Sequence, residues 1–486
     1  MPRRRLFWLL VVLGAMCVGF PMLYVFHALE RLDAVSPNSA ILEPTLEVVI
    51  LLQPSPVDSA NQVARLASIE EYSWGRWLGE SMELYAGIPE GTFLSRPQFL
   101  RIKPVALSPL TPEIRAANDK GGGTTQAAFC YMVEQFLAVL VETKRPFNWF
   151  MFANDHSFIV PSNLKCFLDE VSASFSADLP LYSGNILQRG MYRNVPLKFA
   201  SGGAGVVMSA TSLKLMLFSW VLLGSSVIDK LQIRLERGCP ESELGEEVEL
   251  VDVVGRGGKD VQCAILQTMR WRHRDNHRSQ LTIRISQKVQ LFVNKGLDAA
   301  STMLIQYQTS SDASRGHVPV VKTLPLDELV KCDPSRTPWD RMNPGLPLAY
   351  CLQHIFSAQL VPTTEGEGER FNVFGALRTL SGDVDSWYLE CKQNLPVGSL
   401  DRRGTGVAAK PLAVAPHLVS FHYVSQAESV LLYQYLSGQL PLSSAEDVAS
   451  RWPQTEKAAG HYSRIIKRNS QDAAQLFSFL KSTVVC

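Results

Sequence analysis

Apolar runs of strand length recur along the chain, and several of them end in turn residues. The clearest run, Trp149–Phe152, leads directly into the polar turn Asn154-Asp155-His156. A short continuous apolar run of this kind is typical of a strand that helices cover on both faces. Residues 45–56 predict the first such strand, and the turn Gly202-Gly203-Ala204-Gly205 precedes another apolar run. The pattern therefore predicts an α/β fold.

Helical spacing separates these strands. Residues 59–78, 124–144 and 213–224 each predict a helix, whereas residues 79–123 are poorly periodic and predict loops around one further strand. A helix after residue 160 places four apolar residues on one face: Leu164, Phe167, Leu168 and Val171. Since ligands of α/β sheets bind at the carboxyl ends of the strands, the polar turn after residue 153 is the candidate site.

The N-terminus predicts a membrane anchor. The segment from Leu6 to Phe26 is uncharged and apolar. Its length is close to that of a helix that spans a bilayer, about 20 residues. Arg3, Arg4 and Arg5 place the N-terminal end in the cytoplasm by the positive-inside rule. This predicts a type II protein with the remaining chain in the lumen; the alternative is a cleaved signal peptide.

Composition excludes some classes of partner and permits disulfides. A hydrophobic content of 46% supports a sizeable core, and a net charge of +1 disfavours nucleic acid. Of nine cysteines, all but Cys17 follow the apolar N-terminal run. In an oxidising lumen these residues can form disulfides.

Two stretches of the chain carry recognisable motifs, "WFMFANDHSF" (149–158) and "SGGAGVVMS" (201–209). They resemble motifs of the Fringe-like and core 1 galactosyltransferase family of β-1,3-glycosyltransferases. The first is similar to a family motif with three consecutive acids, and the second matches the glycine motif "SGGAGYVLS". Further similarity lies in Ser73-Trp74-Gly75, in residues 349–374 and in the "SFHY" motif at 420–423. The resemblance implies a GT-A (Rossmann-like) nucleotide-sugar binding sheet with helices on both faces, preceded by the transmembrane helix.

The expected organisation follows from these matches. Residues 1–5 form a cytoplasmic tail, 6–26 the anchor and 27–45 a stem. The core has a donor and metal half (46–236) and an acceptor half (349–440), followed by a polar C-terminal tail (441–486). Residues 237–348, which have no counterpart in the family, are expected to form a solvated insertion, although their basic stretch "RWRHRDNHR" (270–278) could also bind an anion.

The resemblance also implies a site. In the family a divalent metal, usually Mn²⁺, neutralises the diphosphate of the donor, and both carboxylate and imidazole are acceptable ligands of manganese. Asp155, His156 and His422 fall on the positions that imply metal ligands. Asn154 replaces an acid as a neutral hydrogen-bonding residue, and Gly202 and Gly203 match the glycine pair near the acceptor. The alternative is that the altered triplet has lost the metal.

The general base has two alignments. The first retains the Asp-Val pair of the family motif at Asp260 and Val261, and we favour Asp260 as the base. The second places Gly345 at that position, which leaves no carboxylate there unless the nearby Asp340 replaces it. A disulfide between Cys239 and Cys263 would brace the loop that carries Asp260.

The expected function is that of an inverting enzyme of the Golgi or endoplasmic reticulum. It would transfer a hexose, galactose by the resemblance, from a UDP-sugar donor to a hydroxyl of a glycoprotein or glycan acceptor in β-1,3 linkage. The resemblance also allows a homodimer. The rival hypothesis is a catalytically inactive relative that acts as a lumenal chaperone or glycan-binding protein.

Overall fold

The structure, a computed structural model, describes the core of the chain. The described residues are 46–53, 61–89, 99–107, 145–192, 195–223, 345–381, 384–393, 412–441, 443–452 and 470–486, with short strands between 248 and 325 and single positions between 132 and 143 and at 332. The predicted anchor (6–26) and stem (27–45) lie outside these residues. Within the described part, no helix is both long and apolar enough to cross a membrane.

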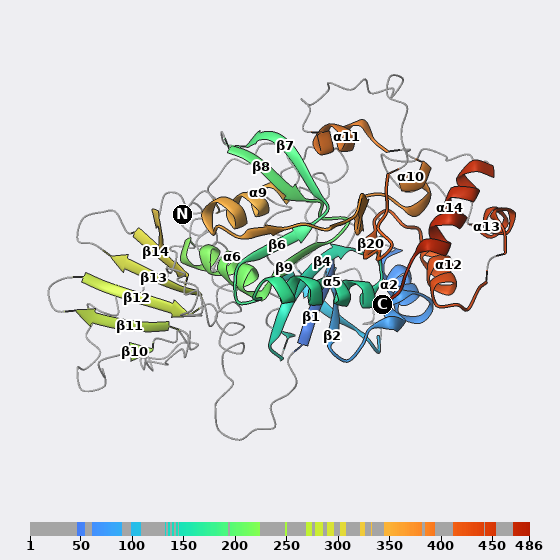
Figure 1. The fold of residues 1–486 in the computed structure, drawn as a ribbon. Helices are drawn as coiled ribbons and strands as arrows, with labels where there is room; N and C mark the ends of the chain where they lie inside the picture. The colour runs from blue at the N-terminus through green and yellow to red at the C-terminus, as the bar shows by residue number, and fades with distance from the viewer. Residues whose placement is uncertain are drawn as a thin grey trace, which may run out of the picture.

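A seven-stranded mixed sheet forms the centre of the molecule (Figure 1). Its order is β16-β6-β9-β4-β1-β2-β3, and the pairs on either side of β1 are parallel, whereas β9 runs antiparallel to both of its neighbours. The strands are β1 (Leu46–Gln53), β2 (Met82–Pro89), β3 (Ile102–Leu107), β4 (Phe147–Asn154), β6 (Leu181–Gly184), β9 (Val206–Ser209) and β16 (Gln359–Val361). The predicted α/β class is confirmed, with a sheet consistent with a Rossmann-like fold.

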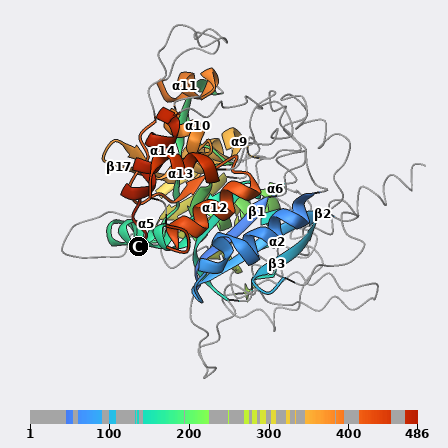
Figure 2. The ribbon, with the colours of Figure 1, turned by 90° about the vertical axis from the view of Figure 1, so that its right-hand side faces the viewer.

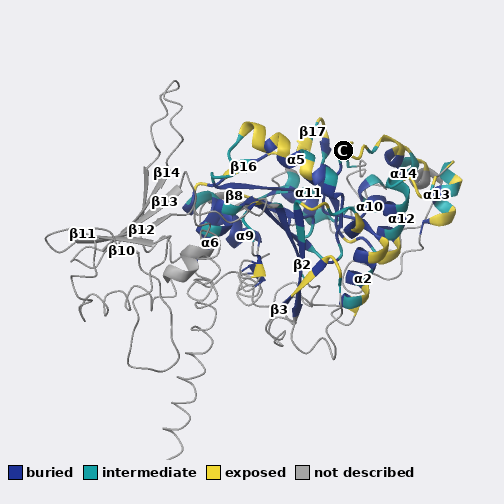
Figure 3. Ribbon diagram, turned by 90° about the horizontal axis from the view of Figure 1, so that it is seen from below, coloured by how far each residue is buried: buried dark blue, intermediate teal, exposed yellow. Residues whose placement is uncertain are grey.

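The two central strands are buried on both faces, as their continuous apolar sequences predict. Residues Val48 to Leu52 of β1 are fully buried, and β4 is buried from Trp149 to Ala153. Figure 3 shows this buried centre as a dark blue band. On one face of β4, the ring of Phe136, a helical residue of the predicted 124–144 segment, packs on Phe150 and Phe152 at centroid distances of 5.1 and 5.2 Å. These core contacts fix the position of β4 and therefore of the polar turn that follows it.

Helices follow the strands much as the spacing predicts. Helix α2 (Gln62–Tyr72) and the 3₁₀ turn η2 (Trp74–Trp77) follow β1, and α6 (Ala210–Leu223) follows β9. Helix α5 (Pro161–Ser174) follows the polar turn Asn154-Asp155-His156, called the site turn below. The four apolar residues predicted on one face of α5 are all buried. Figure 2 shows α2 beside α12 (Gln426–Leu436), with which it is in contact.

The prediction for residues 79–123 is wrong in one respect, because two strands of the sheet, β2 and β3, lie there instead of one. β2 has the sequence MELYAGIP, and it is buried on both faces at Leu84 to Ala86. A strand covered on both faces needs no polar alternation, so periodicity gives it little signal.

Short elements from both halves of the core and from the C-terminal segment lie around the main sheet (Figure 1). They are α9 (Gly345–Tyr350), the π-helix η4 (Cys351–Ile355), α10 (Ala376–Ser381), α11 (Ser386–Gln393) and α13 (Ala445–Arg451), the hairpins β7 (Ile186–Tyr192)–β8 (Val195–Ala200) and β17 (Thr364–Glu365)–β18 (Gly368–Glu369), and a small sheet of β19 (Phe371–Asn372), β20 (Ser420–Phe421) and β5 (Phe158–Ile159). The small sheet matters most, because β5 directly follows the polar turn of β4.

Residues of the predicted insertion form a second sheet. Its six antiparallel strands are β10 (Val248–Glu249), β11 (Met269–Arg274), β12 (Arg278–Arg284), β13 (Val289–Lys295), β14 (Thr302–Tyr307) and β15 (Val321–Pro325). Of the basic stretch 270–278, residues 270–274 lie in β11, and Arg278 begins β12. Asp260, Cys239 and Cys263 lie outside the described residues, so the predicted base and its disulfide remain predictions.

The C-terminal segment, expected as a polar tail, packs into the core. Helix α14 (Ser470–Ser482) buries Leu476 and Leu480, and its Phe479 ring lies 5.7 Å from that of Phe421 on β20. Among the described residues there are two disulfides, Cys166–Cys486 and Cys332–Cys351. The expectation that cysteines pair is therefore confirmed, although at pairs that the sequence did not identify.

Candidate functional site

The site turn begins where β4 leaves the sheet. The backbone N–H of Asp155 donates to the carbonyl of Gln53, at the end of the adjacent strand β1, over 3.0 Å. The Asn154 side-chain oxygen accepts from the backbone N–H of His156 at 3.1 Å, and the Asn154 carbonyl accepts from the N–H of Ser157 at 2.9 Å. Asn154 thus stabilises the turn through its side-chain oxygen as well as its backbone carbonyl, and a side-chain bond to the backbone two residues on is common for asparagine. The turn presents Asp155 and His156 at the carboxyl edge of the sheet.

The glycine turn lies against this polar turn. The Ser157 hydroxyl donates to the carbonyl of Gly203 at 2.8 Å. On the other side, the Ser420 hydroxyl donates to the carbonyl of Ala204. Positive φ at Gly205 (103°) explains why glycine occupies the last position of the turn. The predicted turn is confirmed, and it joins segments from both halves of the core.

His422 lies beside both the site turn and the glycine turn. The backbone N–H of Val424 donates to the carbonyl of His156 at 2.9 Å, so the segment after β20 runs beside the site turn. The imidazole lies directly against Gly203: a Cβ atom added to this glycine would be 2.0 Å from Cε1 of His422. Gly203 is therefore needed for the close approach of His422, and Gly202, 3.5 Å from Phe152 by the same measure, is not.

His422 is held as a neutral imidazole. Its residue is 6% exposed, and its ring packs on Tyr423 at a centroid distance of 3.7 Å. Burial, followed by the nearby charge of His156, lowers the pKa of His422 to about 3, against a small opposing effect of the Val373 backbone. Its Nδ1 atom is buried and has no hydrogen-bond partner. A buried nitrogen of this kind is costly to leave unpaired, which marks His422 as a functional candidate.

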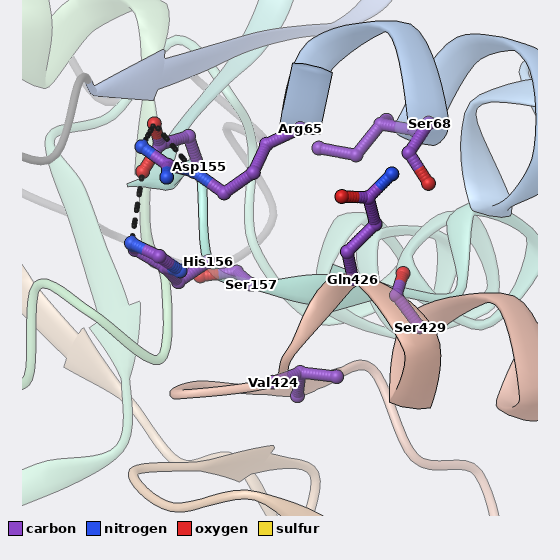
Figure 4. Close-up of a pocket in the computed structure, with 9 residues that line it drawn as sticks. Arg65, Ser68, Asp155, His156, Ser157, Val424, Gln426 and Ser429 are labelled. Atoms are coloured by element: carbon purple, nitrogen blue, oxygen red, sulfur yellow. Dashed lines mark hydrogen bonds and ion pairs between the residues drawn. The ribbon is translucent and has the colours of Figure 1, made fainter. Parts of the chain in front are cut away.

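Asp155 is paired with an arginine that the sequence did not suggest. The Nη2 and Nε atoms of Arg65, on α2, donate to Oδ2 of Asp155 at 2.8 and 3.2 Å. The Asp155 side chain is fully buried and that of Arg65 is 7% exposed. On its other side, Oδ1 of Asp155 lies 3.9 Å from Nε2 of His156. Figure 4 shows Arg65 and His156 converging on the carboxylate from different elements.

A small pocket adjoins this ion pair. Arg65, Asp155, His156 and Ser157 line one part of it, and α12 supplies Gln426 and Ser429 (Figure 4). Its volume of about 10 Å³ accommodates about one water molecule. The Ser73 hydroxyl, in the motif Ser73-Trp74-Gly75, contacts the Ser429 hydroxyl at 2.6 Å, and Trp74 Nε1 donates to the carbonyl of Ser157 at 3.1 Å. This motif therefore holds Ser157 and Ser429, two residues that line the pocket, in place.

The expected metal ligands do not form a metal site in the described part of the chain. There, no three His, Cys, Asp or Glu side chains are grouped so that they could hold an ion. The only carboxylate among the expected ligands, Asp155, is already neutralised by Arg65. The residues therefore do not fit the ion as they are arranged, and manganese binding stays a prediction of the resemblance.

The two alignments of the base have different outcomes. Gly345, in the second alignment, is the buried first residue of α9, and Cys351, which matches the family motif, pairs with Cys332. Asp260 and Asp340 lie outside the described residues. The residues that the motifs place at 370–374 are structural: Phe371 packs beside Gly205, and Arg370 bridges to Glu170 at 2.8 Å.

The fold and the site define the class as an α/β protein with a polar cluster at the carboxyl edge of a mixed sheet. No protein-family model matches the sequence, and no curated protein matches it.

Proposed function

We propose that the protein is a nucleotide-sugar-dependent glycosyltransferase, which transfers a hexose from a UDP-sugar to a glycan hydroxyl in β-1,3 linkage. One observation supports this most. The polar turn (154–157), the glycine turn (202–205) and the histidine segment (420–424), which carry the family resemblance, form one hydrogen-bonded cluster, although the last lies more than 200 residues from the others. Motif residues that meet at the carboxyl edge of an α/β sheet favour a ligand site there.

The reaction has simple requirements. The acceptor oxygen forms a bond to the anomeric carbon, the bond from that carbon to the diphosphate oxygen breaks, and UDP leaves with the electron pair. The acceptor proton passes to a base, for which Asp260 remains the predicted residue. Positioning and electrostatic stabilisation of the leaving group supply most of the rate in such transfers. Asp155, His156 and Arg65 are among the charged or polar side chains at the described edge.

The disulfides favour the proposed lumenal placement. Cys166–Cys486 and Cys332–Cys351 persist in oxidising compartments such as the secretory pathway. A Golgi or endoplasmic reticulum location, with a glycoprotein or glycan acceptor, therefore belongs to the same proposal.

A second candidate function has its own support. Because Arg65 already neutralises Asp155, and because Gly345 is no base, the cluster also suits an inactive relative that binds glycans or unfolded glycosyltransferases. Such a protein would bind without turnover.

The test is UDP binding and UDP-sugar hydrolysis by the full-length chain in detergent. We expect calorimetric UDP binding, at least tenfold weaker in His156→Ala, because the His156 side chain is 28% exposed, whereas that of Asp155 is fully buried. His417→Ala is the matched control, since His417 pairs with Glu365 outside the pocket. UDP binding without hydrolysis or transfer from any UDP-sugar would favour the binding protein, and the absence of UDP binding would exclude the transferase.

A further inference from the structure

The Arg65–Asp155 ion pair occupies the position where the resemblance implies a metal. Asp155 is the one acidic residue left in the site turn, and its Oδ2 accepts two N–H bonds from the guanidinium. Both side chains are buried, so water screens the pair little. The charge of the carboxylate is therefore compensated within the protein.

A divalent ion would have to compete with Arg65 for this carboxylate. If the guanidinium remained, the ion would approach a buried positive charge; if it were displaced, Arg65 would be left buried without its partner, which is strongly destabilising. The other two expected ligands are histidines, which add no negative charge. His422 in particular is buried and packed against Gly203.

We propose that Arg65 takes the place of the divalent cation at Asp155, so that the site binds a nucleoside diphosphate without metal. This inference rests on the proposed function, because it assumes a UDP-sugar donor. Arginine is suited to the role: its planar guanidinium has five N–H donors in a fork that matches carboxylate and phosphate oxygens, and it stays charged at any physiological pH. Arg65 lines the same pocket as His156 and Ser157, so its position is at the edge where the diphosphate would lie.

Two measurements on the wild-type full-length chain in detergent test this directly. UDP is titrated by calorimetry in manganese chloride and in EDTA, and Mn²⁺ alone is titrated with detection of free ion by electron paramagnetic resonance. We expect UDP affinities within about threefold of each other in the two buffers and no stoichiometric Mn²⁺ binding.

Variants then assign the effect to Arg65. In EDTA, Arg65→Ala is expected to bind UDP at least tenfold more weakly, and added Mn²⁺ should restore binding because Asp155 becomes available. Arg76→Ala, which removes an exposed arginine shortly after α2, is the matched control and should behave as wild type. If Arg65→Ala does not fold, as judged by circular dichroism, the wild-type measurements decide alone.

The measurements distinguish a failure of this inference from a failure of the proposed function. UDP binding that requires Mn²⁺ in the wild type, or stoichiometric Mn²⁺ binding by it, overturns the role of Arg65 and leaves the proposed function standing. No UDP binding in either buffer overturns the proposed function, and the nucleotide part of this inference with it.

Discussion

Protonation of His422 should destabilise the fold, because the imidazole is buried as the neutral form. Its pKa falls from an ordinary 6.5 to about 3, mainly through burial and secondly through the charge of His156. The perturbation is His422→Asn, which removes the titrating group. The groups around it are His156 in the site turn, the Tyr423 ring and the backbone of Gly203.

The sign and size follow from linkage. A depressed pKa means that the unfolded chain takes up a proton at a pH where the folded chain does not, so stability is complete above pH 6.5 and is lost as pH falls towards 3. Each pH unit in that window costs about 1.4 kcal/mol. Between pH 7 and pH 4, His422 should lower the free energy of unfolding by about 3 kcal/mol, given its pKa of about 3.

Urea unfolding in EDTA, followed by tryptophan fluorescence, measures the difference. Both proteins lose stability towards acid for other reasons, so the quantity of interest is the change in wild type minus the change in His422→Asn. We expect wild type to lose about 3 kcal/mol more over this range. Equal pH slopes for the two proteins would refute the assignment of a buried, neutral His422. His156→Ala should reduce the effect partly, since it removes only the second cause.

Two other predictions concern packing at the site and behind it. Gly203→Ala should destabilise the protein by about 1 to 3 kcal/mol, because the new Cβ atom would overlap the His422 ring, whereas Gly202→Ala should be tolerated. Thermal unfolding of both variants measures the difference. If the contact is the cause, the double variant Gly203→Ala/His422→Ala should recover stability relative to Gly203→Ala. Asn163→Ala should cost about 2 to 3 kcal/mol, because this buried amide bonds the backbones of residues 418, 484 and 486; the exposed Asn148→Ala is its control, and equal unfolding midpoints would contradict the reasoning.

Sequence patterns identified the parts of the fold that depend on local burial. The apolar run at 149–152, the four-residue stripe on α5 and the glycine turn at 202–205 all appear where they were predicted. Their signals are local, because a continuous apolar run, a helical period or a glycine cluster is visible within about a dozen residues. The same logic could have found α14, since Leu476, Phe479 and Leu480 have helical spacing and are buried.

The contacts that define the site are of a different kind. Arg65 and Asp155 are 90 residues apart, and Ser420 and Ala204 are 216 apart. An arginine in an amphipathic helix usually lies in solvent, so nothing local distinguishes Arg65 from Arg76. The family resemblance predicted that His422 and Gly203 belong to one site, because it relates segments that are far apart in the sequence. It made no prediction about Arg65.

The charge balance of the site turn explains why a buried arginine lies beside Asp155. The motif that this turn resembles has three consecutive acids, whereas this chain has Asn154, Asp155 and His156 there. Three carboxylates at the end of a buried strand need a multivalent cation to offset their repulsion and desolvation, whereas one carboxylate is balanced by one guanidinium. The single carboxylate of this turn and its pairing with Arg65 are therefore two parts of the same arrangement. Introducing acids with Asn154→Asp and His156→Asp should weaken the fold at neutral pH unless Arg65 is removed or a divalent ion is supplied.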